Sequence, residues 1–576
     1  MKWIKTEEKY FLMLLTVAAA VLFFVLYVNT KPAIEEVNAK AAYSSLDNWN
    51  IAFSDANGAE LHEDKSIYVQ DSNLYDVYIS VFPTKDASGE MIDLSAFGLH
   101  TSRDHSYNPT LNCNIQILEE GKTPDPLLDL NQKNATIRVR GNSARGDLYK
   151  SYRVRLSEET GKFFGQEVLN INKHSEDEPK ISSKLCSDLL ADIPDIAGYR
   201  TYFMRLWIRD ASLPEEEQKF VYQGLYTEIE QPNKTYLETH GLSSNAVMYK
   251  ARDFSFFPRQ ELRDVDDPLY SEEDFEMILG IREGTSHQKL LEMLEAVNDP
   301  ARDFEEVFHT YFNEENYLTW AAFSMLAGIR DLENHNYILY SPENALTWYF
   351  IPWDFDGANW IDTMKNTLPS LCGPQRMNIA VLHRRYFRME GSMEKLIKKM
   401  QELLDTAVTR EHVTELLESY KPVLEKTMGL SPDIGLLDFE PNELMPYLDG
   451  MYDGILNNYQ NAVNAIEFPA PGYVAAPERL ADGAIKFAWD PFYSYQGRPL
   501  TYTIQVFSDI QMQNLLYEDT NITSTEYVME QGLEDGTYYV MISATDSEGN
   551  TQVSLEHYEE IGKWILVPGL REFTLE

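Results

Sequence analysis

Four oxygen-bearing side chains near the middle of the chain have the right chemistry for a metal site. They are Asp331, Asn336, Asp354 and Asp356. Carboxylate and amide oxygens are the ligands that Mg²⁺ prefers, whereas a zinc site would be built from His or Cys side chains. We therefore expect these residues to bind a hard divalent cation, Mg²⁺ or Mn²⁺, where the fold brings them together.

A β-hairpin would bring them together. Residues 337–340 predict one strand, residues 341–344 a turn, and residues 346–351 the returning strand. The two open ends of a hairpin lie side by side. The pair of polar residues that precedes the first strand would therefore meet the pair that follows the second strand.

The spacing of these residues is similar to that of a protein-kinase active site. Asp331, followed five positions later by Asn336, has the pattern of a kinase catalytic loop. In that loop the Asp accepts the proton of the substrate hydroxyl and the Asn holds a metal ion. Residues 354–357 (Asp-Phe-Asp-Gly) have the look of the metal-binding segment that follows it. Each pattern alone has low specificity, because an Asp-rich turn after a hairpin is usually a solvated loop.

A second stretch has the composition of a phosphate-binding loop. Residues 135–156 predict two alternating strands around a loop that carries Gly141, Asn142, Ser143 and Gly146. Glycines let backbone amides approach an anion closely. The basic residues of the stretch include Arg140, Arg145, Lys150, Arg153 and Arg155. It is not a Walker A loop, because the Gly-Lys-Ser/Thr ending is absent. An ordinary hairpin with a basic outer face remains the alternative.

Several short segments occur in an order that is more specific than any one of them. The series opens with residues 140–143 (Arg-Gly-Asn-Ser) and 150–153 (Lys-Ser-Tyr-Arg), and it closes with residues 331–336 and 351–356. Between them lie residues 169–172, 184–190, 203–208, 224–228 and 247–251. This order resembles that of the spore-coat protein H (CotH) kinase family. The resemblance covers roughly residues 70–465, in pieces.

The resemblance implies an α+β fold with an atypical protein-kinase-like domain. It also implies transfer of the γ-phosphoryl group of ATP to Ser or Thr hydroxyls of secreted or surface proteins. In that reading Asp331 orients or deprotonates the acceptor hydroxyl. Asn336 and Asp354 hold the metal ion, and Asp356 is an additional metal ligand.

The resemblance also implies residues that bind the nucleotide. They are Lys150, Glu228, Arg140, Asn142 and Ser143. Lys150 would contact the phosphates, and Glu228 would position a lysine by analogy with the kinase Lys–Glu pair. Arg140, Lys173 and Lys250 are rival candidates for the phosphate-binding cation.

The amino-terminal segment has the length and composition of a membrane anchor. Residues 10–28 form an unbroken apolar or neutral run, long enough for a helix that crosses a bilayer. Lys2, Lys5 and Lys9 precede it and predict a cytoplasmic amino terminus, with the bulk of the chain outside the cytoplasm. The alternative is a secreted protein, released by cleavage of a signal peptide at residues 39–41 (Ala-Lys-Ala).

Composition shifts divide the chain further. The predicted divisions are a membrane anchor at 1–32, a stalk with the start of a β-rich region at 33–69, a CotH kinase-like domain at 70–468, a linker at 469–471, a fibronectin type III-like domain at 472–564, and a tail at 565–576. Residues 70–132 are either part of the kinase-like domain or a separate β module. The fibronectin type III resemblance implies an all-β sandwich, which would act as a spacer or bind a surface protein or a carbohydrate.

The overall composition narrows the classes of function. Among the 576 residues, 92 acidic and 49 basic side chains give a formal net charge of -43. Such a surface repels the phosphates of nucleic acids and excludes them as partners. The 3 cysteines are odd in number and have no metal-like spacing, so a disulfide framework is excluded. Three functions remain open: an active kinase, a non-catalytic adhesion or scaffold protein with a kinase-like fold, and a metal-dependent hydrolase that uses the same carboxylates.

Overall fold

The computed structural model describes most of the chain beyond residue 60. The described residues are 61–575, except 71, 103–105, 123–130, 175–176, 178, 330–331, 359–372, 438–439 and 561–564. The predicted anchor at 10–28, the alternative cleavage site at 39–41 and the predicted catalytic residue Asp331 lie outside the described residues. Within the described ranges, no helix is both long enough and apolar enough to span a membrane.

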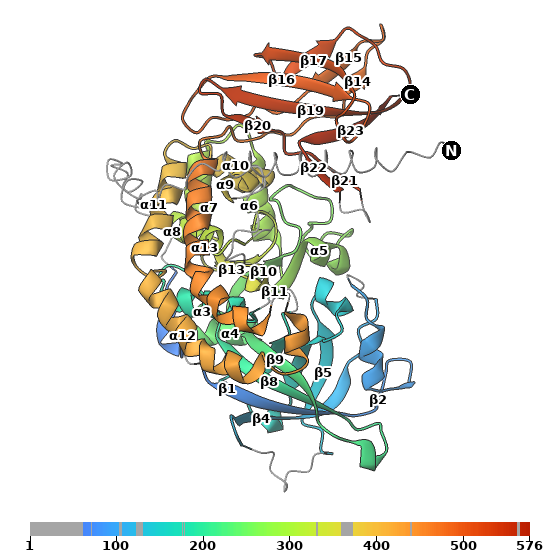
Figure 1. Ribbon diagram of the computed structural model, residues 1–576, viewed down its shortest axis with the longest axis vertical. Helices are drawn as coiled ribbons and strands as arrows, with labels where there is room; N and C mark the ends of the chain where they lie inside the picture. Colours follow the sequence, from blue (N-terminus) through green and yellow to red (C-terminus); the bar gives the residue numbers. More distant parts are fainter. Residues whose placement is uncertain are drawn as a thin grey trace, which may run out of the picture. The chain divides into compact units, whose positions relative to one another are not determined.

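A closed β-barrel forms the first layer of the fold (Figure 1). Its strands, in spatial order, are β1 (Leu74–Val81), β4 (Leu111–Glu119), β5 (Ala135–Arg140), β6 (Ser151–Leu156), β7 (Val168–Asn172), β9 (Val221–Glu230) and β8 (Thr201–Asp210). Neighbours are antiparallel except for β1 and β8, which are parallel and close the barrel. β1 and β4 are thus strands of the same barrel as β5 to β9. A short hairpin, β2 (Thr84–Lys85) and β3 (Met91–Ile92), lies between them in the sequence.

The period of two in the barrel strands decides which side chains face its core. In β5, Ile137 and Val139 are buried in the barrel core. Arg138 and Arg140 alternate with them and are only partly buried, so they lie on the outer face. The same alternation in β6 places Val154 in the core. The barrel therefore has an apolar interior and a basic outer face along β5 and β6.

A second sheet contains the predicted hairpin. Its strand order is β11 (Leu279–Glu283), β10 (Ala246–Ala251), β12 (Tyr337–Pro342) and β13 (Tyr349–Pro352). The antiparallel pairing of β12 with β13 confirms the hairpin. The returning strand begins at Tyr349 rather than at residue 346. The reason is that the Trp348 N–H donates to the carbonyl oxygen of Tyr311 at 2.6 Å, outside the sheet.

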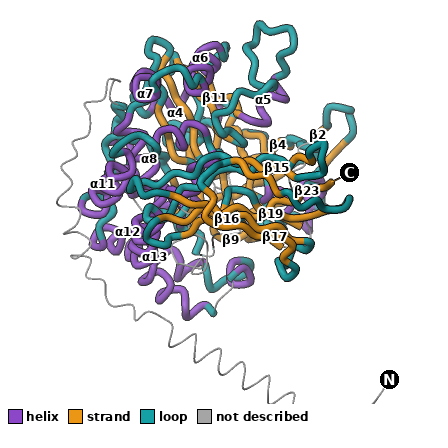
Figure 2. The backbone as a smooth tube through the Cα atoms, turned by 90° about the horizontal axis from the view of Figure 1, so that it is seen from above, coloured by secondary structure: helices purple, strands orange, loops and turns teal. Residues whose placement is uncertain are grey.

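The helices complete a mixed α+β fold. They are α3 (Ser182–Ala191), α4 (Lys234–Thr239), α5 (Glu272–Ile278), α6 (Gln288–Asn298), α7 (Phe304–Tyr311), α8 (Glu314–Leu326), α9 (Gly373–Arg376), α10 (Val381–Tyr386), α11 (Ser392–Asp405), α12 (Arg410–Thr427) and α13 (Leu444–Ala465). Figure 2 shows α8, α11, α12 and α13 gathered on one side. Of these, α8 packs against β13, and its side chains Trp320 and Phe323 are buried. The helix thereby packs against the second strand of the hairpin.

The carboxy-terminal part is all-β. One sheet has the order β14 (Glu478–Arg479), β15 (Ile485–Ala488), β18 (Glu526–Met529), and the other β17 (Leu515–Ile522), β16 (Leu500–Phe507), β19 (Gly536–Asp546), β20 (Thr551–Val553). A separate hairpin joins β21 (His557–Glu560) and β22 (Ile565–Pro568). Phe487 of the first sheet and Ile504 and Ile542 of the second share one core, which makes a sandwich. The predicted tail contributes β23 (Leu570–Leu575), which pairs with β19 and extends the sandwich beyond residue 564.

Candidate active site

The hairpin brings two predicted metal ligands to one mouth. Asn336 directly precedes β12, and Asp354 follows β13 by two residues. The Trp353 N–H donates to the carbonyl oxygen of Asn336 at 2.9 Å, which joins the two segments beyond the last ladder pair. Asn336 and Asp354 both have left-handed backbones, with φ values of 59° and 68°. Such conformations are costly for residues other than glycine and concentrate at functional sites.

Asp354 faces a lysine from the neighbouring strand β10. The Lys250 Nζ lies 3.9 Å from the Asp354 Oδ2, and it stands over the Trp353 ring at 5.1 Å from the ring centre. Desolvation lowers the pKa of Lys250 to about 8, against the opposing charge of Asp354. Desolvation also raises the pKa of Asp354, although Lys250 acts in the opposite direction. The Asp354 side chain is 49% exposed, so the pair is open to a ligand.

Asp356 is held by a histidine from the barrel side. It lies in the 3₁₀ turn η6 (Phe355–Gly357), and its Oδ2 is 3.3 Å from the Nδ1 of His174. His174 follows β7 and is almost fully buried, with a left-handed backbone at a φ of 51°. Desolvation acts to raise the pKa of Asp356, but the hydrogen bond and charge of His174 outweigh it and the pKa is lowered. Phe355 is buried between the two acidic residues and anchors the turn.

The glycine loop lies at the end of β5. Gly141 has a φ of 102°, and a Cβ atom there would be 3.2 Å from the Cβ of Ala144, so the tight turn requires glycine. The turn continues into η3 (Ser143–Gly146), with Asn142 as its amino-terminal flanking residue. The predicted residues Arg140, Asn142 and Ser143 are therefore consecutive parts of one turn.

The carboxylates at the hairpin mouth act on Arg140, at the start of this turn. Burial lowers the pKa of Arg140, and the charges of Asp354, Asp356 and Glu228 oppose that shift. The Arg140 Nε is buried and has no hydrogen-bond partner within the described part of the chain. The loop thus presents a cation with unused hydrogen-bonding capacity to the candidate metal ligands.

A comparison with protein-family models shows which family the chain belongs to. The model described as CotH kinase protein matches residues 137–435, just over half of the chain. The chain belongs to the CotH kinase family. The CotH match begins in β5, includes the glycine loop and both ends of the hairpin, and ends in the 3₁₀ turn η9 (Asp433–Leu436). No match is found among curated proteins.

Within this CotH domain, Lys150 and Glu228, which were predicted to contact the phosphates and to position a lysine, form hydrogen bonds with separate partners. The Lys150 Nζ donates to the carbonyl oxygen of Arg145 at 2.7 Å, which closes the glycine loop. Glu228 is fully buried, and its Oε2 accepts a hydrogen bond from Gln166 at 3.2 Å. Burial raises the pKa of Glu228 to about 8. Of the candidate cations, Arg140 is the one whose pKa responds to Glu228 as well as to the hairpin carboxylates.

The donor set of the CotH site fits a hard divalent cation. Asp354, Asp356 and Asn336 can each supply a side-chain oxygen as a ligand, which suits Mg²⁺ or Mn²⁺. No group of three or more His, Cys, Asp or Glu side chains suited to a metal ion occurs among the described residues. Of the four predicted ligands, Asp354 and Asp356 are carboxylates within the described residues. Asn336 is an amide, and Asp331 lies outside the described residues.

Sequence reasoning missed a buried ion pair behind the CotH site. The Lys173 Nζ is 2.6 Å from the Asp433 Oδ1, and it also donates to the carbonyl oxygens of Gln223 and Leu225, at 2.9 and 3.3 Å. The Asp433 Oδ2 accepts from the backbone N–H of Leu225 at 2.7 Å. This pair ties η9 to the barrel next to His174. Lys173, a rival candidate for phosphate binding, therefore forms its hydrogen bonds within the protein.

The segment that leads into β12 is also braced. The backbone N–H of Phe254 donates to the carbonyl oxygen of Asn334 at 2.9 Å, and the Tyr337 hydroxyl donates to the carbonyl oxygen of Phe254 at 2.8 Å. The Arg376 Nε donates to the carboxylate of Glu333 at 2.8 Å. These contacts hold the residues between positions 331 and 337. No short-range sequence pattern connects them.

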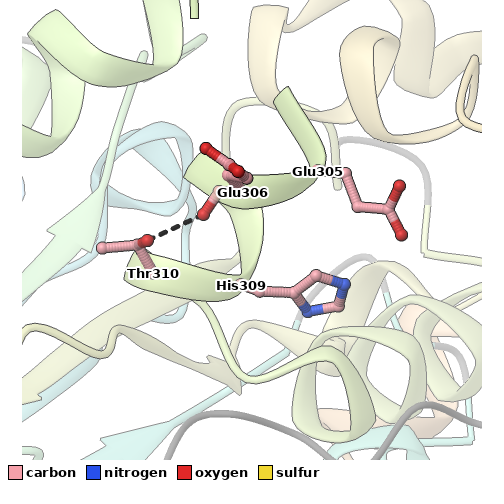
Figure 3. Close-up of a pocket in the computed structure, with 4 residues that line it drawn as sticks. All are labelled: Glu305, Glu306, His309 and Thr310. Atoms are coloured by element: carbon pink, nitrogen blue, oxygen red, sulfur yellow. Dashed lines mark hydrogen bonds between the residues drawn. The ribbon is translucent and has the colours of Figure 1, made fainter. Parts of the chain in front are cut away.

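A surface depression on α7 lies apart from these residues. Its lining consists of Glu305, Glu306, His309 and Thr310 (Figure 3). All four belong to one helix, and the Thr310 hydroxyl donates to the backbone carbonyl of Glu306 at 2.7 Å. None of the predicted site residues lines it. It therefore has no part in the candidate CotH site.

Proposed function

We propose that this chain is an ATP- and metal-dependent protein kinase that phosphorylates Ser or Thr residues of surface or secreted proteins. One observation carries the proposal: Asn336 and Asp354 meet at the hairpin mouth, with Asp356, Lys250 and Arg140 around them. Oxygen ligands beside cations suit a metal-bound polyphosphate. Membership of the CotH kinase family supports a kinase-like activity.

Each residue would have a distinct task. Asn336, Asp354 and Asp356 would hold Mg²⁺ or Mn²⁺, which would neutralise phosphate charge when bound. Arg140 and Lys250 would attract the phosphate oxygens and orient the γ-phosphoryl group. The acceptor hydroxyl oxygen would form the new P–O bond as the bond to ADP breaks, and its proton would go to the Asp331 carboxylate.

The location of the protein is a further part of the proposal. The apolar run at residues 10–28, preceded by lysines, supports a single-pass membrane protein with the bulk of the chain outside the cytoplasm. Release by cleavage near residues 39–41 is the alternative. Detection of the intact amino terminus in the membrane fraction would support the anchor, whereas a mature chain that begins after residue 41 would support secretion.

The activity is tested with two variants that the proposal separates. Asp354→Asn removes a metal ligand, so metal-dependent ATP binding and phosphoryl transfer should both be lost. Asp331→Asn keeps the metal ligands, so ATP binding should remain while transfer to a protein acceptor falls by about 10²-fold or more. Transfer of ³²P from labelled ATP and ATP affinity are measured side by side. Full transfer activity in both variants would overturn the proposal.

A further inference from the structure

A row of arginines extends from the candidate site along the outer face of β5 and β6. Arg138 and Arg140 of β5 point away from the barrel core. Arg153 and Arg155 occupy the same face of β6, and the register pairs Arg138 directly with Arg153. We call these four residues the arginine ladder. Like charges directly opposite one another in a sheet are destabilising.

The arginine ladder lacks the partners that arginines usually find. Within the described residues, none of its four guanidinium groups lies within 4.0 Å of a carboxylate. Arg153 donates to the neutral amide oxygens of Asn170 and Gln231, at 3.2 and 2.7 Å. The chain has 92 acidic residues against 49 basic ones, so carboxylates are abundant. The lack of carboxylates beside these four arginines is therefore specific to this face and does not follow from the composition of the chain.

A fifth arginine, on the second sheet, acts electrostatically on the arginine ladder. Arg282 of β11 is close enough to Arg140 and Arg153 for the charges to act on one another. Burial, reinforced by these neighbours, lowers the pKa of Arg153 to about 9 and that of Arg282 to about 10. The Arg282 Nε, like that of Arg140, is buried and has no partner in the described part of the chain.

Asp354, Asp356 and Glu228 act on Arg140, at the end of the arginine ladder nearest the candidate site. The acidic residues near Arg155 and Arg282 are paired with other basic residues. Glu167 lies near Arg155 but is paired with Lys162 at 2.8 Å. Glu276 lies near Arg282 but is paired with Arg252 at 3.5 Å. Neither offsets the arginine ladder fully. The remaining positive charge is suited to an external anion, and the planar guanidinium fork matches phosphate oxygens in particular.

We propose that Arg138, Arg153 and Arg155 of the arginine ladder, together with Arg282, bind a phosphorylated segment of the protein acceptor, so that this kinase prefers Ser or Thr residues next to existing phosphoserine or phosphothreonine. The inference rests on the proposed function. Under that function, ATP carries about four negative charges, which a divalent metal ion, Lys250 and Arg140 would already balance. Arg138, Arg153, Arg155 and Arg282 are then in excess of what the nucleotide requires.

The geometry places this excess charge beside the reacting group. Arg138 is two residues from Arg140 along β5, about 7 Å further from the hairpin mouth. An extended acceptor with its hydroxyl at the mouth would bring a residue two positions away to that distance. Each phosphoryl group transferred would then create a ligand for the arginine ladder. Phosphorylation of a Ser-rich acceptor should therefore accelerate as phosphates accumulate.

Direct binding tests the inference without relying on catalysis. Three peptides of one sequence are compared, with a serine flanked two positions away by phosphoserine, by serine, or by lysine. Full-length protein should bind the phosphoserine peptide at least tenfold more tightly than the other two, with an affinity that falls as salt rises. The double variant Arg138→Gln/Arg155→Gln should lose this preference. Arg479→Gln, which removes one positive charge from the sandwich, should retain it and is the charge-matched control for Arg155→Gln alone.

The outcomes separate this inference from the proposed function. An ATP- and metal-dependent thermal shift is recorded for each protein. Phosphopeptide preference that disappears in the double variant, with the ATP shift unchanged, supports the inference. Equal binding of all three peptides overturns it, and so does loss of the ATP shift with phosphopeptide binding intact, because the arginine ladder would then belong to the nucleotide. Absence of any ATP shift in the wild type overturns the proposed function instead. Arg155→Gln alone, at an exposed position, replaces the double variant where that fails to fold.

Discussion

Two lysine–aspartate pairs lie close to the candidate site and differ in how completely they are satisfied. Desolvation lowers the pKa of both Lys173 and Lys250 to about 8. The Lys173–Asp433 pair is 2.6 Å long, and neither side chain is more than 1% exposed. The Lys250–Asp354 pair is 3.9 Å apart, and its aspartate is 49% exposed. The lysine pKa values are alike, so geometry and not titration distinguishes the two pairs.

The difference indicates separate roles. Lys173 donates to two backbone carbonyls besides Asp433, so its hydrogen-bonding capacity is used within the protein. Lys250 and Asp354 are too far apart for a hydrogen bond with one another. Their hydrogen-bonding capacity is therefore available to a ligand. A buried pair with every partner in place holds the fold, whereas a loose pair at a mouth can exchange its partner for metal and phosphate. The predictions below would break or sharpen this distinction.

The largest effect is expected from breaking the buried Lys173–Asp433 pair, which we call the closed pair. Asp433→Asn leaves Lys173 buried without a counter-charge, which costs about 3–5 kcal/mol of stability. Chemical unfolding monitored by tryptophan fluorescence measures the loss. Asp453→Asn removes an exposed partner of Arg410 and should cost less than about 1 kcal/mol. Equal losses in the two variants would contradict a structural role for the closed pair.

Replacing both partners of the closed pair tests its structural role further. Lys173→Met combined with Asp433→Leu removes both charges and keeps apolar volume, so it should recover part of the stability that Asp433→Asn loses. The same unfolding measurement decides this. A double variant less stable than Asp433→Asn would mean that the charges contribute more than packing can replace.

A smaller effect on stability is expected at the Lys250–Asp354 pair, which we call the open pair. Asp354→Asn should change the free energy of unfolding by less than about 1 kcal/mol, because the side chain is half exposed. It should lower the rate of phosphoryl transfer by about 10²–10³-fold, because a metal ligand is lost. Steady-state rates with Mg²⁺ and Mn²⁺ measure this. Unchanged rates, with a large loss of stability, would reverse the roles that we assign to the two pairs.

Lys250→Met should have a more modest consequence. It removes one charge-assisted contact to phosphate, so the dissociation constant for ATP should rise about tenfold with stability nearly unchanged. Titration calorimetry with ATP and Mg²⁺ measures the change. Lys173→Met is the matched variant, and it should lower stability while leaving ATP affinity unaltered. A larger loss of ATP affinity in Lys173→Met would identify the closed pair as the nucleotide contact.

The smallest effect concerns Glu228, a buried carboxyl group with no ion pair within 4.0 Å in the described residues. Burial raises its pKa to about 8, well above the ordinary range of a glutamate, so the folded protein binds the proton more tightly than the unfolded chain does. Its contribution to stability is therefore complete below the unfolded pKa and is lost as pH rises through about 8. Glu228→Gln should remove that loss. Melting temperatures at pH 5 and 8 should then differ less in the variant than in the wild type, and a larger difference would contradict the raised pKa.

The sequence predicts the local part of this site well. The hairpin is confirmed because its alternation and turn chemistry lie within one short stretch, and Asn336 and Asp354 meet as that hairpin requires. The α+β class and the CotH family are also confirmed, and the strands predicted in the carboxy-terminal part form a sandwich. Each of these follows from periodicity or from ordered motifs that neighbouring residues carry.

The long-range part could not be predicted in the same way. Lys173 and Asp433 are 260 residues apart, and His174 is 182 residues from Asp356. Side chains this distant meet only through the packing of whole elements, and no local pattern records the contact. Lys150 was assigned to the phosphates by analogy, and in the structure it donates to the carbonyl oxygen of Arg145. The roles assigned to the site residues, Asp331 and the metal ligands included, remain predictions.

One measurement tests the distinction between the two pairs most directly. Thermal unfolding of the wild type, Asp354→Asn and Asp433→Asn is recorded with and without ATP and Mg²⁺ or Mn²⁺. A ligand that binds only the folded state must raise the melting temperature. We predict that Asp354→Asn keeps the wild-type melting temperature and loses the ligand-dependent rise, while Asp433→Asn melts at a lower temperature and retains the rise. A rise that persists in Asp354→Asn, or that requires no metal ion, would contradict the assignment of the hairpin mouth as the nucleotide and metal site.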